Sequence, residues 1–580
     1  MAGDAPDTVL QPASDTTAVA VNGSSVDGIA TQVGTGNRAP SESVMRSAGI
    51  VSVAVLMSRV TGLLRESLMA RLFGAGLAYD AFMLGFRIPN LTRDLFAEGA
   101  LSSAFVPVFT EYLNKRSKEE AARLAQLVAT AIFLVVGAVC AAGVIFAPAL
   151  VHLLAPGYAA VPGKFELAVS MTRIMFPFLL LVALAAQAMG VLNASNRFGV
   201  PAMASTFFNI GSVGFGLLLG IVLGPSLHLS RIEGMAIGVV LGGALQLVWQ
   251  LPSLYRLGFR FRFAIDWDHA GLRRILQLMG PAILGSAAVQ INVMVNTNFA
   301  SSIQDPVRGL DGPVSWLGYA FRFMQLPLGL FGVALGSATL PSISRSAAAG
   351  NMDEFRRTLS KSLGMVFLLT VPSSVGLAVL GNSIIGAIYQ GGRFQIYDTQ
   401  QTATALSCYA IGLAGYAALK VIGPAYYALG DARTPMVISL ASIAINFVTA
   451  MVTIRYTNLG HAGLALSTSA VSLFSFFVLF DVLRRRIGGV YGRELMRGIW
   501  KVLGASLVMG VVVWFSSRTV AGWLGIGQFG RFIDVLISIP LGLVAFYAVC
   551  RMLGVEELAM ALRAFLNPIR RRFARASKTQ

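Results

Sequence analysis

The chain has 580 residues, of which 55% are hydrophobic and only 12% are charged, and its formal net charge is +18. Soluble proteins carry about a quarter charged residues, and a soluble globule of this size needs more polar surface than this composition supplies. The composition therefore argues against soluble enzymes, disordered scaffolds and secreted disulfide proteins, and it predicts a polytopic membrane protein.

The N-terminal segment 1–42 differs from the rest of the chain. It is rich in Ser, Thr, Gly, Ala and Asp and contains no apolar run. This composition is typical of disordered segments, and the basic and apolar regions of a signal peptide are missing. We expect the segment to form a disordered cytoplasmic tail.

From Ser43 to position 555, apolar segments follow one another at the length of a membrane span. A spanning helix needs about 20 mostly apolar residues, and this criterion predicts an all-α protein with about 14 transmembrane helices. The first, second and eighth segments carry charges. The expected spans cover residues 45–72, 77–112, 122–149, 166–193, 200–224, 234–256, 271–300, 313–342, 356–380, 402–428, 434–455, 461–484, 498–521 and 531–554.

Lys and Arg gather in alternate loops. One set includes Lys115, Arg123, Arg256, Arg345 and Arg484, and the C-terminal tail adds Arg570 to Arg572. The other set holds little beyond Lys164, Arg231, Arg308, Arg393, Arg455 and Arg518. Cytoplasmic loops of membrane proteins collect Lys and Arg, so topology accounts for most of the net charge and no nucleic-acid partner is needed. We expect a multi-pass membrane protein with both termini in the cytoplasm.

The chain also repeats internally. One and the same spacing separates three pairs of matching positions: Pro107 and Pro341, Pro201 and Pro435, and Gly157 and Gly391. A duplicated unit of six spans predicts two parallel lobes, an architecture in which transporters bind their substrate between the lobes. We assign residues 43–260 to an N-lobe with spans one to six, 261–490 to a C-lobe with spans seven to twelve, 491–556 to the last two spans and 557–580 to a basic cytoplasmic tail.

Four arginines lie within predicted spans rather than in loops: Arg59, Arg65, Arg93 and Arg322. A charge at membrane depth costs roughly 2.5–3.5 kcal/mol on insertion scales, so several cations together need a polar cavity, counter-ions or an anionic ligand. The planar guanidinium matches phosphate and stays charged when desolvated. We expect these arginines to converge on a cavity that binds a phosphorylated head group, with Asp80 and Glu98 as counter-ions or gating residues.

A purely structural role is the alternative for several of these charges. Arg65 with Glu66, and Arg93 with Asp94, could be local ion pairs, while Arg71 and Arg87 could extend to the membrane surface. Lys420 could either line a cavity or extend to the membrane surface in the same way. We interpret three amides of the seventh span as interhelical hydrogen-bonding groups rather than ligands: Asn292, Asn296 and Asn298.

No pattern points to catalysis, a metal or a cofactor. The three cysteines lie inside apolar runs, the four histidines are scattered, and no nucleotide-binding loop or Ser/His/Asp arrangement stands out. We therefore expect a transporter rather than an enzyme, with no cofactor.

Several motifs resemble the MurJ (MviN) family of lipid II flippases, which belongs to the multidrug/oligosaccharidyl-lipid/polysaccharide (MOP) exporter superfamily. The similarity runs from about residue 45 to 555. The motifs include Ser58-Arg59-Val60-x-Gly62-x-x-Arg65, Tyr79-Asp80-Ala81-Phe82, Pro89-Asn90-Leu91-x-Arg93-x-x-Phe96-Ala97-Glu98-Gly99-Ala100, Ala104-Phe105-Val106-Pro107, Gly280-Pro281-Ala282-Ile283-Leu284-Gly285 and Gly332-Val333-Ala334-Leu335-Gly336.

The resemblance implies transport of lipid II, which is undecaprenyl-diphosphate-GlcNAc-MurNAc-pentapeptide, from the inner to the outer leaflet for peptidoglycan biosynthesis. It also implies two six-helix lobes, two extra helices that form a groove for the lipid tail, and membrane lipids and cell-wall synthesis proteins as further partners. Family residues important for transport match the four arginines, and a family aspartate and glutamate match Asp80 and Glu98.

The sequence departs from some family members near the eighth-span arginine. Those members carry acids at the positions of Phe321 and Gln325, so the cavity here is expected to be more positive. Some members bind sodium with acids and amides of the seventh and eleventh spans. Asn446 could be a remnant of that site, but no matching acid accompanies it.

Three other functions compete with this interpretation. An exporter of another undecaprenyl-diphosphate-linked oligosaccharide would need the same arginines, whereas a drug exporter would not. A glycosyltransferase or ligase acting on the same lipid would need a catalytic acid or base and usually a large outer loop. A scaffold that kept the fold would tolerate loss of the buried charges.

Overall fold

The computed structural model describes residues 42–93, 101–490 and 492–562. These residues form α-helices joined by short turns, with two isolated β-bridges. Nearly all of the predicted N-terminal tail, Glu98 and the tail beyond residue 562 lie outside the described residues, as does the side chain of Arg93.

The first half of the chain contains ten α-helices of five or more residues within its described part. They are α1 (Glu42–Phe73), α2 (Leu77–Arg93), α3 (Ser102–Lys115), α4 (Lys118–Ile145), α5 (Ala147–Leu154), α6 (Lys164–Met175), α7 (Pro177–Ala194), α8 (Gly199–Leu217), α10 (Arg231–Val248) and α11 (Leu251–Arg256). Shorter helical segments are η3 (Pro156–Ala160), η4 (Leu218–Val222) and α9 (Gly224–Leu227).

The second half has longer and less interrupted helices. They are α12 (Ala270–Ser301), α13 (Pro313–Pro327), η5 (Leu328–Val333), α14 (Ala334–Ala348), α15 (Met352–Tyr389), α16 (Ile396–Ala428), α17 (Arg433–Tyr456) and α18 (His461–Arg486), followed by α19 (Gly492–Leu524) and α20 (Gln528–Met552).

Each predicted span coincides with one helix or with consecutive helices. Within the described residues, eleven such segments are long and apolar enough to cross a membrane, including α13–α14, which carries Arg322. The predicted spans 45–72, 77–112 and 271–300 are helical over their described parts but are not among the eleven. The fold is therefore an all-α membrane fold.

The helix boundaries repeat with the spacing found in the sequence. The starts of α4 and α15, and likewise those of α8 and α17, are separated by the same offset as the paired prolines. The side chains of Ser117 and Asn351, at matching positions, each accept a hydrogen bond from the backbone N–H three residues ahead and so cap α4 and α15. The two halves thus begin corresponding helices with the same chemistry.

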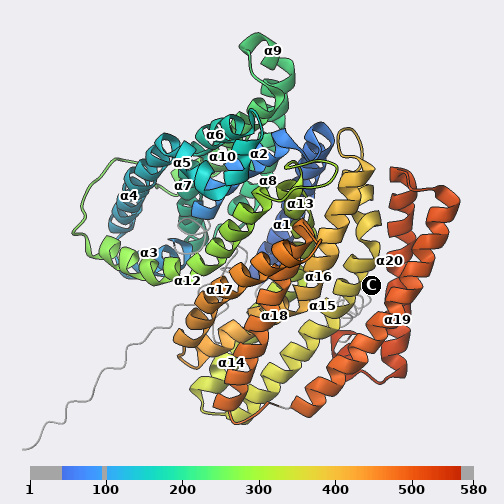
Figure 1. The fold of residues 1–580 in the computed structure, drawn as a ribbon. Helices are drawn as coiled ribbons and strands as arrows, with labels where there is room; N and C mark the ends of the chain where they lie inside the picture. The colour runs from blue at the N-terminus through green and yellow to red at the C-terminus, as the bar shows by residue number, and fades with distance from the viewer. Residues whose placement is uncertain (1–41, 94–100, 491, 563–580) are drawn as a thin grey trace, which may run out of the picture.

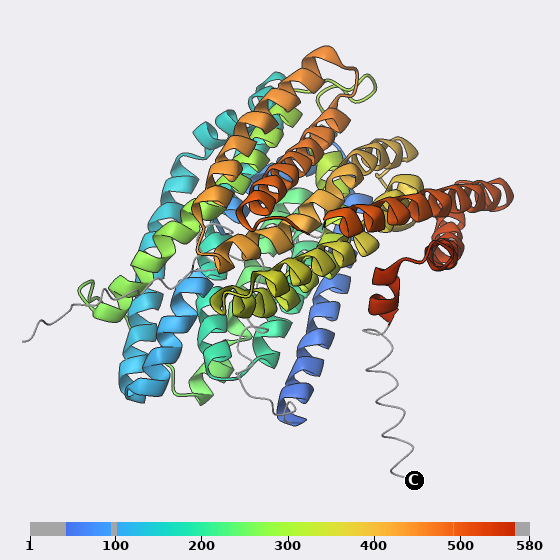
Figure 2. The ribbon, with the colours of Figure 1, turned by 90° about the horizontal axis from the view of Figure 1, so that it is seen from below.

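In Figure 1 most of α2–α10 lie to the left and above, most of α14–α18 lie below and to the right, and α1, α12 and α13 run between them. We call α1–α11 the first lobe and α12–α18 the second lobe. The last two helices, α19 and α20, lie at the edge of the molecule beside α15 in both ribbon views (Figures 1 and 2). Their buried residues share a small apolar core with α15, which includes Leu368, Val502 and Phe546.

The two ends of the helices differ in charge. One end, called the basic end here, carries Arg123, Arg256, Arg274 and Arg484 and the start of α1. The other, called the opposite end, carries the turns at residues 74–76, 155–163, 302–312 and 390–395. At the basic end, Arg123 near the start of α4 pairs with Asp266 and so joins two segments that are distant in the chain.

Candidate functional site

At the opposite end, a buried carboxylate joins the two lobes. Asp80 lies in the first turn of α2, and its side chain accepts hydrogen bonds from the backbone N–H groups of Gly312 (2.9 Å) and Ser315 (3.0 Å) and from the Ser315 hydroxyl. These groups form the start of α13, where the helix dipole favours an anion. Asp80 of the first lobe therefore caps a helix of the second.

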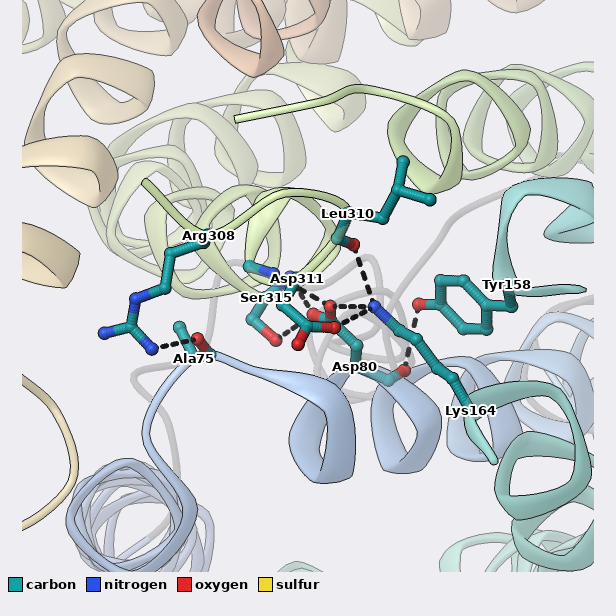
Figure 3. Close-up of polar contacts among 9 residues, drawn as sticks. Ala75, Asp80, Tyr158, Lys164, Arg308, Leu310, Asp311 and Ser315 are labelled. Atoms are coloured by element: carbon teal, nitrogen blue, oxygen red, sulfur yellow. Dashed lines mark hydrogen bonds and ion pairs between the residues drawn. The ribbon is translucent and has the colours of Figure 1, made fainter. Parts of the chain in front are cut away.

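Lys164, the first residue of α6, neutralises this carboxylate (Figure 3). Its ammonium is fully buried and lies 2.8 Å from Asp80, 2.7 Å from Asp311 and 2.8 Å from the carbonyl oxygen of Leu310. These three contacts use all three ammonium donors. The Tyr158 hydroxyl donates to the backbone oxygen of Asp80 at 3.3 Å and completes the cluster.

A second ion pair lies next to this cluster. Arg308 contacts the buried carboxylate of Asp398 at 2.9 Å, and the indole N–H of Trp316 donates to the same carboxylate at 3.1 Å. Arg308 also reaches the carbonyl oxygen of Ala75 in the first lobe at 3.4 Å. Hydrogen bonds and ion pairs thus join the two lobes at the opposite end.

One member of each ion pair occupies a corresponding place in the repeat. Lys164 begins α6 and Asp398 lies in the first turn of α16, at the same offset as the paired prolines. Both side chains are fully buried, but they carry opposite charges. In the sequence Lys164 and Arg308 look like ordinary residues of the less basic loops, so only their placement reveals these contacts.

In the last third of α1, three charged side chains from both lobes meet. The Glu66 carboxylate is 2.9 Å from the Arg65 guanidinium and 3.0 Å from that of Arg322 on α13. The Tyr79 hydroxyl donates to its second oxygen at 2.9 Å. The structure therefore brings Arg65 and Arg322 together through an acid that the sequence suggested only as a local partner of Arg65.

Aromatic rings hold Arg65 in position. Its guanidinium lies 5.1 Å from the ring centre of Phe208 and 5.9 Å from that of Phe86, a cation–π arrangement. One of its nitrogens, Nη1, is buried without a hydrogen-bond partner among the described residues. Arg65, Glu66 and Arg322 line a cavity of only about 10 Å³, which has room for about one water molecule.

Arg59 lies in a different and larger cavity. The side chain is exposed, and no hydrogen bond or ion pair is recorded for it among the described residues. It lines a space of about 210 Å³ together with Ser58, Asn193 and Ser205. A Cβ at Gly329 of the second lobe would lie 3.1 Å from its guanidinium, so glycine permits this close approach. Arg59 thus stands between the lobes, about 9 Å along α1 from Arg65.

Two other predicted site residues lie wholly or partly outside the described residues. Arg93 ends α2, but its side chain is outside the described residues, as is Glu98 altogether. Arg87, which the sequence suggested could extend to the membrane surface, instead donates to Thr297 of α12 at 2.7 Å. It therefore forms a further contact between the lobes.

The amides of α12 form the predicted interhelical hydrogen bonds. Asn292 donates to Ser442, Asn296 to Thr468 and Asn298 to the carbonyl oxygen of Leu153. Asn446 of α17 donates to Asn296 at 3.1 Å. The recorded partners in this cluster are amides, hydroxyls and backbone oxygens, and within the described part of the chain no three His, Cys, Asp or Glu residues group as metal ligands.

Comparison with protein families gives one match over most of the chain. The family model described as "Lipid II flippase MurJ" matches residues 69–531. The lipid II flippase MurJ of Burkholderia cenocepacia is 34% identical over 471 residues, which is 80% of this chain and 88% of that protein. The probable lipid II flippase MurJ of Vibrio cholerae is 32% identical over 527 residues, which is 89% of this chain and 97% of that protein.

Solved structures agree with this match. A lipid II flippase MurJ in an inward closed conformation superposes with a TM-score of 0.70 at 27% identity, covering 87% of this chain and 99% of that one. A MATE multidrug transporter of the MOP superfamily in an inward-facing conformation superposes with a TM-score of 0.56 at 15% identity, covering 80% and 97%. The second likeness concerns the fold alone.

Proposed function

Because the chain belongs to the MurJ family and is a lipid II flippase of the bacterial inner membrane, we propose that its inter-lobe arginines bind the diphosphate of lipid II. The cargo is undecaprenyl-diphosphate-linked GlcNAc-MurNAc-pentapeptide. It moves from the inner to the outer leaflet as the lobes rock around the bound head group.

The basic end faces the cytoplasm in this proposal, because Lys and Arg collect in cytoplasmic loops. Both termini then lie in the cytoplasm. Residues 43–260 act as the N-lobe, 261–490 as the C-lobe, 491–556 as the helices beside the lipid tail, and 1–42 and 557–580 as cytoplasmic tails. The contacts of Asp80 with Lys164 and Ser315 form the periplasmic gate and are closed.

The diphosphate binds in two steps. Arg59 meets the head group first, since it lines the larger cavity and its guanidinium is exposed. Arg65 and Arg322 then exchange the Glu66 carboxylate for phosphate oxygens, which offer each guanidinium a bidentate partner. The observation that carries the proposal is that two arginines from different lobes share one displaceable anion.

Two residues are assigned to the site from the family motif alone. Arg93 is assigned to the same phosphate site, and Glu98 is assigned to gating or charge balance together with Asp80. The polyprenyl tail stays in lipid beside α19 and α20 while the head group crosses. Proteins of cell-wall synthesis that deliver or consume lipid II are the expected further partners.

Transport by the purified full-length chain in liposomes tests the proposal. Lipid II placed in one leaflet is assayed for appearance in the other, for the wild type and for Arg65→Ala and Arg322→Ala. Arg455→Ala is the matched control, because Arg455 is an exposed arginine at the opposite end. We expect both site variants to insert normally and to lose transport while the control keeps it.

Two results would argue against parts of the proposal. Wild-type rates in both site variants would reject the arginine assignment. Movement of a different undecaprenyl-diphosphate-linked oligosaccharide, with none of lipid II, would reject the cargo and leave the site intact.

A further inference from the structure

The chain crosses from one lobe to the other only once, through residues 257–269 between α11 and α12. This inter-lobe linker is extended over most of its length and follows α4 (Figure 1, the loop at the left edge). The side chain of Gln126 donates to the carbonyl oxygen of Arg260 at 3.0 Å, and the backbone N–H of Ala264 donates to the Thr130 hydroxyl at 3.2 Å. The linker is therefore held against a spanning helix.

The linker runs along α4 away from the start of that helix and then turns back toward it. Arg260 lies beside Gln126 and Ala264 beside Thr130, but Asp266 pairs with Arg123, nearer the start of the helix, at 3.5 Å. Arg123 and Thr130 are separated by about 10 Å along a helix axis. The deepest part of the linker thus lies where the charged start of α4 gives way to its apolar stretch, which is the depth of the membrane interface.

Large apolar side chains of the linker point away from the protein. Phe261, Phe263, Ile265 and Trp267 are 55%, 57%, 59% and 45% exposed. Phe259, by contrast, is buried, and its ring lies 5.7 Å from that of Phe109. Aromatic side chains collect at the level of the lipid head groups, where the ring contacts acyl chains and its edge contacts water.

Basic residues alternate with these apolar ones. Arg260 and Arg262 are exposed on the linker, and Arg256 is exposed at the end of α11. None of the three guanidinium groups has a recorded ion pair among the described residues. Arginines beside interfacial aromatic rings match the phosphate groups of anionic lipids in charge and geometry.

We propose that the inter-lobe linker is an anionic-phospholipid binding site. Phe261, Phe263 and Trp267 insert among the acyl chains of the leaflet at the basic end, and Arg260 and Arg262 hold the phosphate of an anionic head group. The site lies on the outer surface of the protein beside α4, away from the arginines between the lobes. It anchors the one connection that must stay in place while the two lobes move.

Trp267 provides a native probe of this contact. The full-length chain is reconstituted in vesicles with lipids brominated near the head-group end of the acyl chains, and tryptophan quenching is compared between the wild type and Trp267→Phe. The difference isolates Trp267. The same subtraction with Trp316→Phe is the control, because Trp316 is fully buried.

We expect brominated lipid to quench Trp267 strongly and Trp316 hardly at all. Quenching should be stronger when the brominated lipid is phosphatidylglycerol in a phosphatidylcholine background than in the reverse mixture. The exposed double variant Arg260→Gln/Arg262→Gln should remove this preference and keep the quenching itself. Quenching of Trp267 by aqueous iodide alone would overturn the membrane contact, and equal quenching by the two lipids in the wild type would overturn the anionic site. Neither readout depends on lipid II transport.

Discussion

Arg322 of the second lobe and Glu66 of the first form an ion pair of 3.0 Å between α13 and α1. The same carboxylate oxygen also accepts from Arg65, its neighbour in the chain. Glu66 therefore occupies the two guanidinium groups that phosphate oxygens would need. If the arginines bind the diphosphate as we propose, its binding and the release of the carboxylate are one exchange, and the acid sets how tightly the anionic head group is held.

Replacing Glu66 with Gln removes the competing anion and nearly preserves the shape. We expect lipid II to bind more tightly, by roughly tenfold for each 1.4 kcal/mol of lost competition, and to be transported more slowly because release becomes difficult. Lipid titration in detergent and transport in liposomes measure the two effects. Glu166→Gln, at an exposed site on α6, is the control. Unchanged affinity in Glu66→Gln would show that the carboxylate and the substrate do not compete.

Lys164→Met leaves the buried carboxylate of Asp80 without its ammonium partner. Loss of one member of a buried pair typically costs about 3–5 kcal/mol, so we expect a large fall in thermal stability. Asp80→Asn combined with Lys164→Met should cost less than the sum of the two single changes, because both charges are then absent. Unfolding of the four proteins, with the exposed Lys361→Met as control, gives the coupling. Additive effects would mean that the ion pair does not stabilise the contact between the lobes.

Gly329→Val adds a side chain where the Arg59 guanidinium now lies. A Cβ alone would approach Nη2 to 3.1 Å, so a branched side chain must displace the arginine. We expect transport to fall while folding is retained, because Arg59 is exposed and can move away. Gly376→Val on α15 is the matched control, since a Cβ there meets nothing within 4 Å. Normal transport by Gly329→Val would exclude a role for the present position of Arg59.

Asp534 joins α20 to α15 and α19 by hydrogen bonds. Its carboxylate accepts hydrogen bonds from the hydroxyls of Ser383, Ser517 (2.6 Å) and Ser538 (2.6 Å), which belong to α15, α19 and α20. Asp534→Ala should lower stability by about 1–3 kcal/mol, because buried hydroxyls lose their acceptor. Asp534→Asn should lose less stability, because its amide oxygen can still accept hydrogen bonds. Thermal unfolding in detergent measures both, and a wild-type transition in Asp534→Ala would contradict this role.

Much of the helical framework follows from the sequence. The expected span 434–455 corresponds to α17 at Arg433–Tyr456, and the expected span 271–300 corresponds to α12 at Ala270–Ser301. Such agreement arises because apolar runs of membrane length must satisfy their backbone hydrogen bonds within a helix. The duplication can also be recognised in the sequence, because helix caps such as Ser117 and Asn351 depend only on nearby residues.

The partners of the charges were harder to predict. Glu66 could be read only as a neighbour of Arg65, although Arg322 and Tyr79 also contact it. Lys164 looked like a loop residue, although it is fully buried between two acids. The repeat offset between Lys164 and Asp398 indicates that they occupy matching positions. It does not indicate which residues each of them contacts.

The sequence by itself determined that this chain is a duplicated membrane transporter, because composition and apolar length act on each segment separately. Its motifs also pointed to the lipid II flippase family. Only the tertiary structure decided which charges meet. The contacts of Glu66 with Arg322 and of Asp80 with Ser315 join residues that are distant in the chain and belong to different lobes. Such contacts depend on how two separately formed helical units pack, and no local pattern in the chain records that packing.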